Sequence, residues 1–144
     1  MRLRVIHTDW AADGPTLLAI RQRVFVEEQA VPPELEHDVH DATAVHLLAL
    51  VDDTPVGTAR MLPGGHIGRM AVLAEWRGQG IGTTLLRSLL ELAESQGIRS
   101  PYLHAQCSAI GFYERLGFRA EGPEFIDAGI AHRLMRIPEA PASG

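Results

Sequence analysis

The sequence predicts a single α/β domain in which helices flank a mixed β-sheet. Three observations support this fold class. Apolar segments bounded by turn residues alternate with segments of helical spacing, 144 residues are enough for one core, and 46% of them are hydrophobic. We expect residues 1–137 to form the domain. Residues 138–144, with two prolines among small or charged neighbours, are expected to form a flexible tail.

The first half of the chain predicts one strand, one helix and a meander of three strands. Residues 3–7 predict the first strand, and Gly14-Pro15 is expected to open the helix, since proline is tolerated in a first helical turn. Residues 30–43 are polar and interrupted by prolines, which predicts a loop. Short clusters of turn residues then separate three apolar segments, which predicts antiparallel strands. These strands are expected at residues 44–52, 55–62 and 66–73.

The second half predicts the order helix, strand, short helix and two strands. Leucines at helical spacing predict a helix that begins near Gly80 and ends at Gly97. Residues 101–107 predict a strand. Ser108 is expected to cap a short helix that ends at Gly117. The last two strands are expected around residues 118–122 and 130–137.

The overall composition excludes several classes of protein. A net charge of −5 argues against a protein whose main ligand is nucleic acid, which requires a basic face. The single Cys107 excludes an intramolecular disulfide and a cysteine-rich zinc site. The sequence shows no signal peptide and no apolar segment long enough to span a membrane. We therefore expect a cytoplasmic protein that binds neither nucleic acid nor membrane.

The sequence EWRGQGIGTTLL, residues 75–86, places alternating glycines directly before a leucine-rich helix. Exposed backbone amides at a helix N-terminus bind phosphate, which makes this stretch a candidate anion site. A P-loop is excluded because no Lys-Ser or Lys-Thr pair follows the last glycine. A dinucleotide fingerprint fits poorly, because the glycines alternate and the next strand ends without an acidic residue. A purely structural turn that lets strand and helix pack closely remains open at this point.

Two motifs together resemble the GCN5-related N-acetyltransferase (GNAT) superfamily. The first is Arg77-x-x-Gly80-x-Gly82 between a strand and a long helix. The second is the stretch from Gln106 to Phe118, which reads Q-x-x-A-x-x-F-Y-x-x-x-G-F. The resemblance covers nearly the whole chain. It implies a mostly antiparallel mixed sheet that splays between the fourth and fifth strands, and acetyl-CoA as cosubstrate.

Further residues resemble the ElaA-like branch of that superfamily. They include R-x-x-V-F-V-x-E-Q from Arg21, then Glu36, Asp38, Asp41 and His46. Gln106 takes the place of an asparagine that is common in the wider family, and in this branch it is the expected residue. The segment from Glu124 to Met135 is also similar to the branch.

The resemblance implies a set of cofactor-binding residues. The glycine-rich stretch would hold the pyrophosphate with its amides, and the end of the preceding strand would pair with the pantetheine amides. The implied residues are Met70, Ala71, Val72, Arg77, Gly78, Gln79, Gly80, Ile81, Gly82, Thr83, Gln106, Ser108, Phe112 and Tyr113.

Acyl transfer to an amine needs an oxyanion donor, an acid and a base. The resemblance implies a backbone N–H near Ala71 or Val72 as the oxyanion donor and Tyr113 as the acid. A core aromatic is the alternative for Tyr113. For the base we expect His46 or His132, each of which matches the branch pattern and has a suitable ordinary pKa. The sequence leaves other bases open, namely Glu28, Glu36, Asp38, His66 and His104, and a structural role is open for every histidine.

The sequence thus predicts an N-acetyltransferase that moves an acetyl group from acetyl-CoA to a primary amine through a tetrahedral intermediate. Two other classes remain open. One is a non-catalytic acyl-CoA sensor of the same fold. The other is a metal-binding protein that uses His37, Asp38, His40, Asp41 and His46, a spacing that fits no standard zinc pattern. The acceptor is an open choice among small-molecule amine, antibiotic, peptide and lysine. The acidic balance weakly favours a cationic acceptor, and a homodimer is an open expectation.

Overall fold

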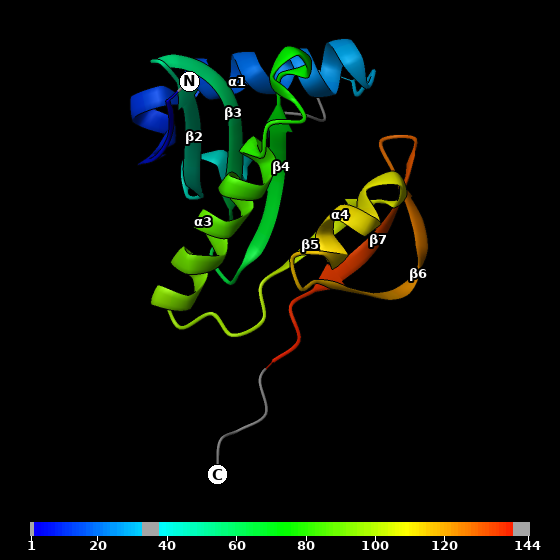
Figure 1. The fold of residues 1–144 in the computed structure, drawn as a ribbon. Helices are drawn as coiled ribbons and strands as arrows, with labels where there is room; N and C mark the ends of the chain where they lie inside the picture. The colour runs from blue at the N-terminus through cyan, green and yellow to red at the C-terminus, as the bar shows by residue number, and fades with distance from the viewer. Residues whose placement is uncertain (1, 33–37, 140–144) are drawn as a thin grey trace.

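The computed structural model describes residues 2–32 and 38–139 and contains one seven-stranded sheet (Figure 1). The strand order across the sheet is β1-β2-β3-β4-β5-β7-β6. Every neighbouring pair is antiparallel except β4 and β5, which are parallel. The strands are β1 (Leu3–Thr8), β2 (Val45–Val51), β3 (Thr54–Met61), β4 (His66–Val72), β5 (Tyr102–Gln106), β6 (Arg119–Asp127) and β7 (Ile130–Arg136).

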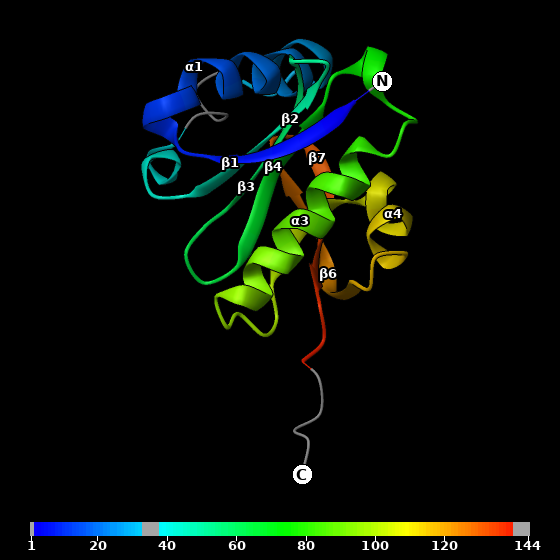
Figure 2. The same cartoon turned by 60° about the vertical axis from the view of Figure 1, so that its left-hand side comes forward.

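Helices cover both faces of the sheet, as the predicted fold class requires. They are α1 (Trp10–Arg21), a π-helix (Gln22–Glu28), α3 (Ile81–Ser95) and α4 (Ile110–Glu114), with 3-10 turns at Val39–Ala42, Ala74–Trp76 and Cys107–Ala109. Figure 2 shows α3 crossing one face of the sheet, with α4 beside it.

Strand β2 shows how the sequence divides its side chains between two cores. Leu47 and Ala49 pack in the cluster that contains α3, whereas Leu48 and Leu50 pack in the cluster that contains α1. This alternation follows the two-residue period of a strand. A continuous apolar strand buried on both faces is the result, and it explains why β2 lacks a polar side.

The predicted splay between the fourth and fifth strands is confirmed. Strands β4 and β5 pair only at His66 with Tyr102 and at Ile67 with Leu103. Beyond these pairs β4 continues to Val72, while β5 pairs on its other side with β7. In Figure 1 the two strands diverge from this point. The divergence leaves one edge of β4 open beside the glycine-rich stretch.

Of the two predicted helix starts for which a capping or opening residue was named, the first misses only an initial turn and the second is wrong. Helix α1 begins at Trp10, because the Asp9 carboxylate accepts a hydrogen bond from the Ala12 N–H at 2.7 Å and caps the helix. Asp13 has non-helical backbone angles, φ −130° and ψ 15°, which divide α1 into two parts. The longer part begins at the predicted Gly14-Pro15, since proline is tolerated in a first helical turn.

Ser108 does not cap the predicted short helix, α4. It lies within the 3-10 turn Cys107–Ala109, and α4 begins at Ile110 without a side-chain cap. The chain enters α4 through the backbone hydrogen bond of this 3-10 turn, and a rule based on residue type does not predict such a start. Strand β6 is also longer than predicted, since it continues past a register shift to Asp127.

Candidate active site

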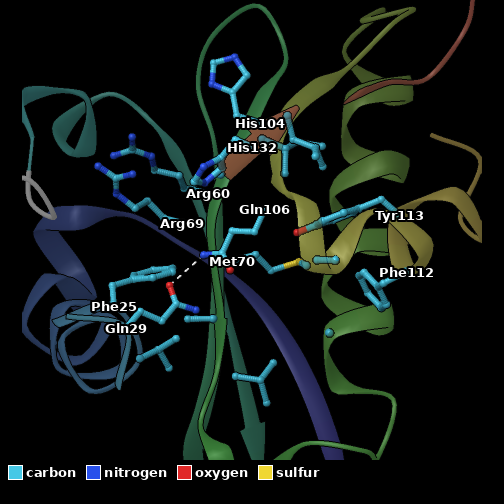
Figure 3. Close-up of a pocket in the computed structure, with 18 of the residues that line it drawn as sticks. Phe25, Gln29, Arg60, Arg69, Met70, His104, Gln106, Phe112, Tyr113 and His132 are labelled. Carbon is cyan, nitrogen blue, oxygen red and sulfur yellow. Dashed lines mark hydrogen bonds between the residues drawn. The ribbon is translucent and has the colours of Figure 1, made fainter. Parts of the chain in front are cut away.

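A cavity of about 730 Å³ lies where β4 and β5 diverge. Its lining comes from the π-helix, the open edge of β4, the glycine-rich stretch, α4 and the start of β7. Figure 3 shows Met70 and Gln106 near its centre, with Tyr113 and Phe112 on one side and Arg60 and Arg69 on the other. Most of the residues that the sequence implied for the cofactor therefore meet in one space.

The glycine-rich stretch presents bare backbone to this cavity. Gly78 and Gly80 have φ values of +78° and +82°, a region that favours glycine. The first amides of any helix have no intrahelical partner. Gly80, the N-cap of α3, has no side chain that could cap them, so they stay available. A Cβ built at Gly82 would lie 3.7 Å from the Phe112 ring, and Gly82 also lines the cavity. These features fit a phosphate held at the start of a helix.

Arg77 is part of the cavity wall, but its guanidinium is engaged by the protein. Its Nη1 and Nη2 donate to the Glu28 carboxylate at 2.6 and 2.8 Å, and its Nε donates to the Val72 carbonyl at 2.9 Å. The hydrogen bond from Arg77 lowers the pKa of Glu28. Arg77, one of the residues that the resemblance implied for the cofactor, thus joins the glycine-rich stretch to the π-helix through its side chain.

Strand β4 contains an irregularity at the centre of the cavity. Its register against β3 shifts between the pairs Thr58–Ala71 and Arg60–Gly68, and Arg69 has a φ of +48°. Such a bulge redirects backbone groups and side chains. Met70, Ala71 and Val72 follow it along the open edge and line the cavity, as expected for strand-like pairing with an extended ligand.

Tyr113 also lines the cavity, and its ring packs against Phe112 and Phe118 at centroid distances of 5.1 and 5.9 Å. Burial raises the pKa of Tyr113 to about 12. The phenol is therefore protonated at neutral pH and has a hydrogen to donate there. The sequence left open whether Tyr113 is a core aromatic or an acid. Its ring packs in an aromatic cluster, and Tyr113 also lines the cavity, so the structure is compatible with both roles.

The structure separates the two histidines that were expected as bases. His132 lies opposite Gln106 on β7 and lines the cavity. Its Nδ1 lies 2.7 Å from the Ile130 carbonyl. Because a carbonyl only accepts, Nδ1 carries the hydrogen in the neutral ring and Nε2 keeps the lone pair. His132 is thus in the tautomer that a base with Nε2 requires.

His46 does not line the cavity. Its side chain is fully buried beneath Trp10, and its Nε2–H donates to the Asp41 carbonyl at 2.9 Å. This hydrogen bond joins the 3-10 turn Val39–Ala42 to β2. The structure therefore does not bring the two expected bases together, and it gives His46 a structural environment.

Gln106 lines the cavity, and its Nε2 donates to the Gln29 side chain at 2.9 Å. Three residues of the implied cofactor set lie elsewhere. Gln79 and Ser108 are exposed outside the cavity lining, and Ile81, the first residue of α3, is buried in the core. Their backbone amides can still contribute where their side chains do not.

The remaining candidate bases occupy different environments. His66 and His104 line the cavity, with ring centroids 4.7 Å apart. Burial, and then the neighbouring His104 and arginines, lower the pKa of His66 to about 4. Glu28 is paired with Arg77, and Glu36 lies outside the described residues.

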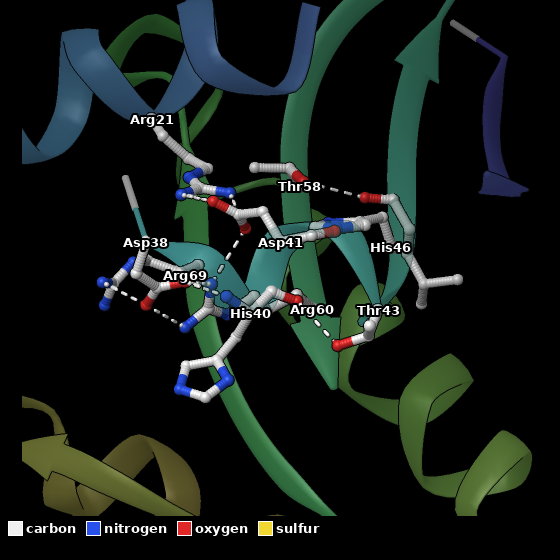
Figure 4. A network of polar contacts seen from close by, with 10 residues as sticks. Arg21, Asp38, His40, Asp41, Thr43, His46, Thr58, Arg60 and Arg69 are labelled. Carbon is white, nitrogen blue, oxygen red and sulfur yellow. Dashed lines mark hydrogen bonds and ion pairs between the residues drawn. The ribbon is translucent and has the colours of Figure 1, made fainter. Parts of the chain in front are cut away.

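Asp38 belongs to a buried charge network (Figure 4). Arg60 donates to Asp38 at 2.8 and 2.9 Å and to Asp41 at 2.8 Å, and Arg21 donates to Asp41 at 2.8 and 3.0 Å. The metal-binding alternative had assigned Asp38 and Asp41 as ligands, whereas the structure pairs both with arginines. His37 lies outside the described residues.

Sequence reasoning missed two arginines of the cavity lining, Arg60 and Arg69. A signal for Arg60 was present, because a charged residue inside an otherwise apolar strand requires a buried partner. The partner, Asp38, is 22 residues away and could not be assigned from spacing.

The fold and the cavity together define an α/β domain with a large cavity between two diverging strands, beside a helix start whose amides are exposed. A family model described as an acetyltransferase (GNAT) domain matches residues 9–138. The chain therefore belongs to the GNAT family. This membership establishes the general class, an acyltransferase that uses CoA thioesters.

Comparisons with individual proteins agree. A Bacillus subtilis protein named only provisionally as an acetyltransferase is 41% identical over 129 residues, which cover 85% of this chain and 88% of that protein. The structure of an acyl-CoA N-acyltransferase from Pseudomonas aeruginosa superposes with a TM-score of 0.86 at 31% identity and covers 95% of this chain and all of that one. Escherichia coli ElaA gives a TM-score of 0.85 at 27% identity, with the same coverage. No helix of the described residues is long and apolar enough to cross a membrane.

Proposed function

We propose that this protein is an N-acetyltransferase that moves an acetyl group from acetyl-CoA to a primary amine. The observation that carries the proposal is the cavity itself. It brings a glycine-rich helix start, the open edge of β4 and the Tyr113 phenol into one space at the splay of the sheet.

The residues present fit the parts of acetyl-CoA. The amides from Gly78 to Thr83 would hold the pyrophosphate, because they lie at a helix N-terminus and need no side chain. The backbone from Met70 to Val72 would pair with the pantetheine amides along the open edge. Acetyl-CoA supplies the activated thioester.

Between heavy atoms, the proposed reaction forms a carbon–nitrogen bond and breaks a carbon–sulfur bond. The neutral amine attacks the thioester carbonyl carbon, a backbone N–H near Ala71 or Val72 stabilises the oxyanion of the tetrahedral intermediate, and the carbon–sulfur bond then breaks. His132 accepts the proton that the amine nitrogen loses, through Nε2. Tyr113 donates a proton to the departing thiolate. The products are an amide and free CoA.

The test is turnover of acetyl-CoA with a panel of amines, measured as release of free thiol. We expect wild-type protein to release thiol only when amine is present. Tyr113→Phe should lower kcat by about 10²-fold. The same variant should keep the thermal stabilisation that CoA gives to the wild type, because the phenylalanine ring preserves the aromatic packing.

Two results would contradict the proposal. Stabilisation by acetyl-CoA with no turnover of any amine, and no change in Tyr113→Phe, favours the non-catalytic sensor. No effect of acetyl-CoA on thermal stability would remove the cofactor assignment as well. Phe112→Leu serves as a control for packing, since it alters the neighbouring ring and leaves the phenol in place.

A further inference from the structure

The Gln106 side chain joins the β5 wall of the cavity to the end of the π-helix. Gln106 is the last residue of β5, and its Nε2 donates to the Gln29 Oε1 at 2.9 Å (Figure 3). The two residues are 77 positions apart in the sequence, and both line the cavity. A side-chain amide has one donating nitrogen and one accepting oxygen. Because Gln29 binds the nitrogen, this hydrogen bond fixes the direction in which the oxygen of Gln106 points.

The backbone holds Gln29 in place. Gln29 is the C-cap of the π-helix, and its N–H donates to the Val24 carbonyl at 3.1 Å. The preceding residue, Glu28, accepts hydrogen bonds from Arg77 at 2.6 and 2.8 Å, which connect this end of the helix to the glycine-rich stretch. Segments of π-helix are rare and occur frequently at functional sites. Gln29 is thus a fixed acceptor for the Gln106 amide.

The strand register places the Gln106 side chain beside His132. The two residues are directly opposite each other on β5 and β7. Side chains of opposite residues in an antiparallel pair lie on the same face, with their Cβ atoms about 5 Å apart. The two-residue period of β5 turns Leu103 and Ala105 toward the core and Gln106 toward the cavity, which His132 also lines.

Each of these two side chains presents a hydrogen-bond acceptor to the cavity. The Nδ1–H of His132 donates to Ile130, so Nε2 carries the lone pair. Gln106 uses its nitrogen for Gln29, so its Oε1 is left to accept. Within the described part of the chain, neither atom receives a hydrogen bond from protein. Neither is enclosed, because every buried side-chain polar atom without a partner in that part belongs to another residue. Two adjacent acceptors of this kind form a site for a group that donates two hydrogen bonds.

We propose that Gln106 Oε1 and His132 Nε2 together bind the two N–H groups of a neutral primary amine, and that Gln29 positions Gln106 for this contact. The inference rests on the proposed function and assigns the residues that orient its acceptor. The resemblance implied Gln106 for the cofactor and gave Gln29 no role, so the two assignments of Gln106 can be tested against each other.

The arrangement accounts for the protons of the reaction. With one N–H on Gln106 and the other on His132, the lone pair of the amine nitrogen is free to attack the thioester carbonyl carbon. After the carbon–nitrogen bond forms, the nitrogen is positively charged, and His132 Nε2 takes the proton that it already binds. The carbon–sulfur bond breaks with its electron pair on sulfur, and Tyr113 donates a proton to the thiolate. The second N–H remains on the amide product and keeps its bond to Gln106.

A secondary amine cannot use both acceptors. It has one N–H, which must bind His132 if the proton is to leave. Its second alkyl group then faces Gln106 Oε1 and leaves that oxygen without a donor. An acceptor that loses its hydrogen bonds to water and gains no new one costs affinity. The site should therefore select primary over secondary amines.

The first experiment compares primary amines with their N-methyl derivatives at saturating acetyl-CoA. The pairs are benzylamine with N-methylbenzylamine and butylamine with N-methylbutylamine. We expect the wild-type kcat/KM of the primary amine to exceed that of its partner by about ten-fold or more. In Gln106→Leu this ratio should shrink by about five-fold or more, because the contact that distinguishes the two amines is gone. A ratio that Gln106→Leu leaves unchanged would overturn the inference.

The KM for acetyl-CoA separates the amine role of Gln106 from the cofactor role that the resemblance implied. Gln106→Leu should leave this KM within about two-fold of the wild-type value, since the lost hydrogen bond is to the amine. A large rise in the KM for acetyl-CoA, with unchanged kinetics toward the amines, would return Gln106 to the cofactor and overturn the inference.

Two variants of Gln29 test its positioning role. Gln29→Leu removes the acceptor that fixes the Gln106 amide and should lower the ratio between primary and secondary amine about as much as Gln106→Leu does. Gln29→Glu keeps an accepting oxygen at the same place and should restore most of the ratio. Gln22→Leu, the same change at an exposed residue of the π-helix, is the matched control and should leave the ratio intact. Equal loss in Gln29→Glu and Gln29→Leu, at an unchanged midpoint of thermal unfolding, would contradict the positioning role.

A binding measurement separates this inference from the proposed function. The probes are N-benzylacetamide and N-benzyl-N-methylacetamide, of which only the first has an N–H, titrated calorimetrically into protein with bound CoA. If no amine turns over, which would contradict the proposed function, tighter binding of the first probe that Gln106→Leu abolishes still supports the site. No difference between the probes in that case would overturn the inference as well. Equal turnover of primary and secondary amines would overturn the inference and leave the proposed function standing.

Discussion

His132 and His46 occupy similar positions in strands and differ in what their ring nitrogens contact. The Nδ1–H of His132 donates to Ile130, which leaves Nε2 as the basic atom of a residue that lines the cavity. His46 uses Nε2 to bond the Asp41 carbonyl and lies outside the cavity lining. The strand register creates this difference, because it places His132 opposite Gln106 and His46 opposite Arg60.

The two histidines therefore give opposite predictions. His132→Gln should lower kcat by about 10²-fold while the midpoint of thermal unfolding changes little, since the base is lost and the fold is kept. His46→Gln should lower the midpoint of unfolding and keep kcat within about two-fold. Steady-state kinetics and thermal denaturation of both variants check this. A large loss of kcat in His46→Gln with normal stability would return the base to His46.

Residue spacing alone could not identify these roles. The glycine-rich stretch was predictable, because its chemistry resides in consecutive residues at one helix start. The place of His132 in the cavity wall depends on its pairing with Gln106 on β5, and the environment of Asp38 depends on an arginine 22 residues away. Such contacts are set by tertiary packing, which a local pattern does not encode.

At the scale of elements, two ion pairs join the π-helix to the segment around the glycine-rich stretch. Arg77 bonds Glu28 at 2.6 and 2.8 Å, and Arg23 bonds Glu75 at 2.9 Å. The π-helix also supplies part of the opposite cavity wall. The π-helix and the segment that leads into the glycine-rich stretch are thus connected by partly exposed side chains.

Glu28→Gln should lower KM for acetyl-CoA a few-fold, equivalent to about 1 kcal/mol or less. The change removes a negative charge beside the proposed phosphate site and releases the Arg77 guanidinium toward it. The gain should shrink at high salt, because the groups are partly exposed and ions screen them. Steady-state kinetics at low and high ionic strength measure the effect.

The matched control for this prediction is Glu94→Gln, which neutralises an exposed glutamate near the C-terminal end of α3. It has the same change in net charge and should leave KM for acetyl-CoA unaltered. A rise of KM in Glu28→Gln would mean that the Glu28 pair positions Arg77 for the cofactor instead of competing with it.

The element boundaries show what sequence patterns miss at this scale. The strands of the meander were predicted to within about two residues, because turn residues bound them on both sides. The first turn of α1 was missed because its cap, Asp9, lies six residues before Pro15, which marks only the part of the helix after the kink at Asp13. The π-helix was missed because its first residues continue the spacing of α1 without a break.

At the scale of the molecule, the charge network holds together elements that the sheet alone does not fix. Arg21 at the end of α1 and Arg60 on β3 both bond Asp41, which lies in the 3-10 turn Val39–Ala42. The side chains of Arg21 and Asp41 are each 1% exposed. The network therefore fixes the turn beside the part of the cavity wall that Arg60 forms.

This burial makes the protein sensitive to acid. Burial by itself raises the pKa of Asp41, but hydrogen bonds and charges from Arg21 and Arg60 outweigh it and hold the pKa below its ordinary value of 3.8. The hydrogen bonds from Arg60 also hold the pKa of Asp38 well below that value. The unfolded state therefore binds these protons at higher pH than the folded state does. The stability that the carboxylates contribute is full well above pH 3.8, and it is lost progressively as the pH falls from about that value toward the lower pKa values of the folded state.

Asp41→Asn should accordingly destabilise the protein at neutral pH by about 3–5 kcal/mol, because it leaves two buried arginines with one fewer partner charge. It should also flatten the decline of stability in acid, since one of the responsible carboxylates is gone. Asp53→Asn is the matched control. It breaks the exposed pair with Arg4, in which Asp53 is 87% exposed, and should cost about 1 kcal/mol or less. Urea denaturation between pH 3 and 7 measures both variants, and equal losses would show that the network stabilises no more than a surface pair.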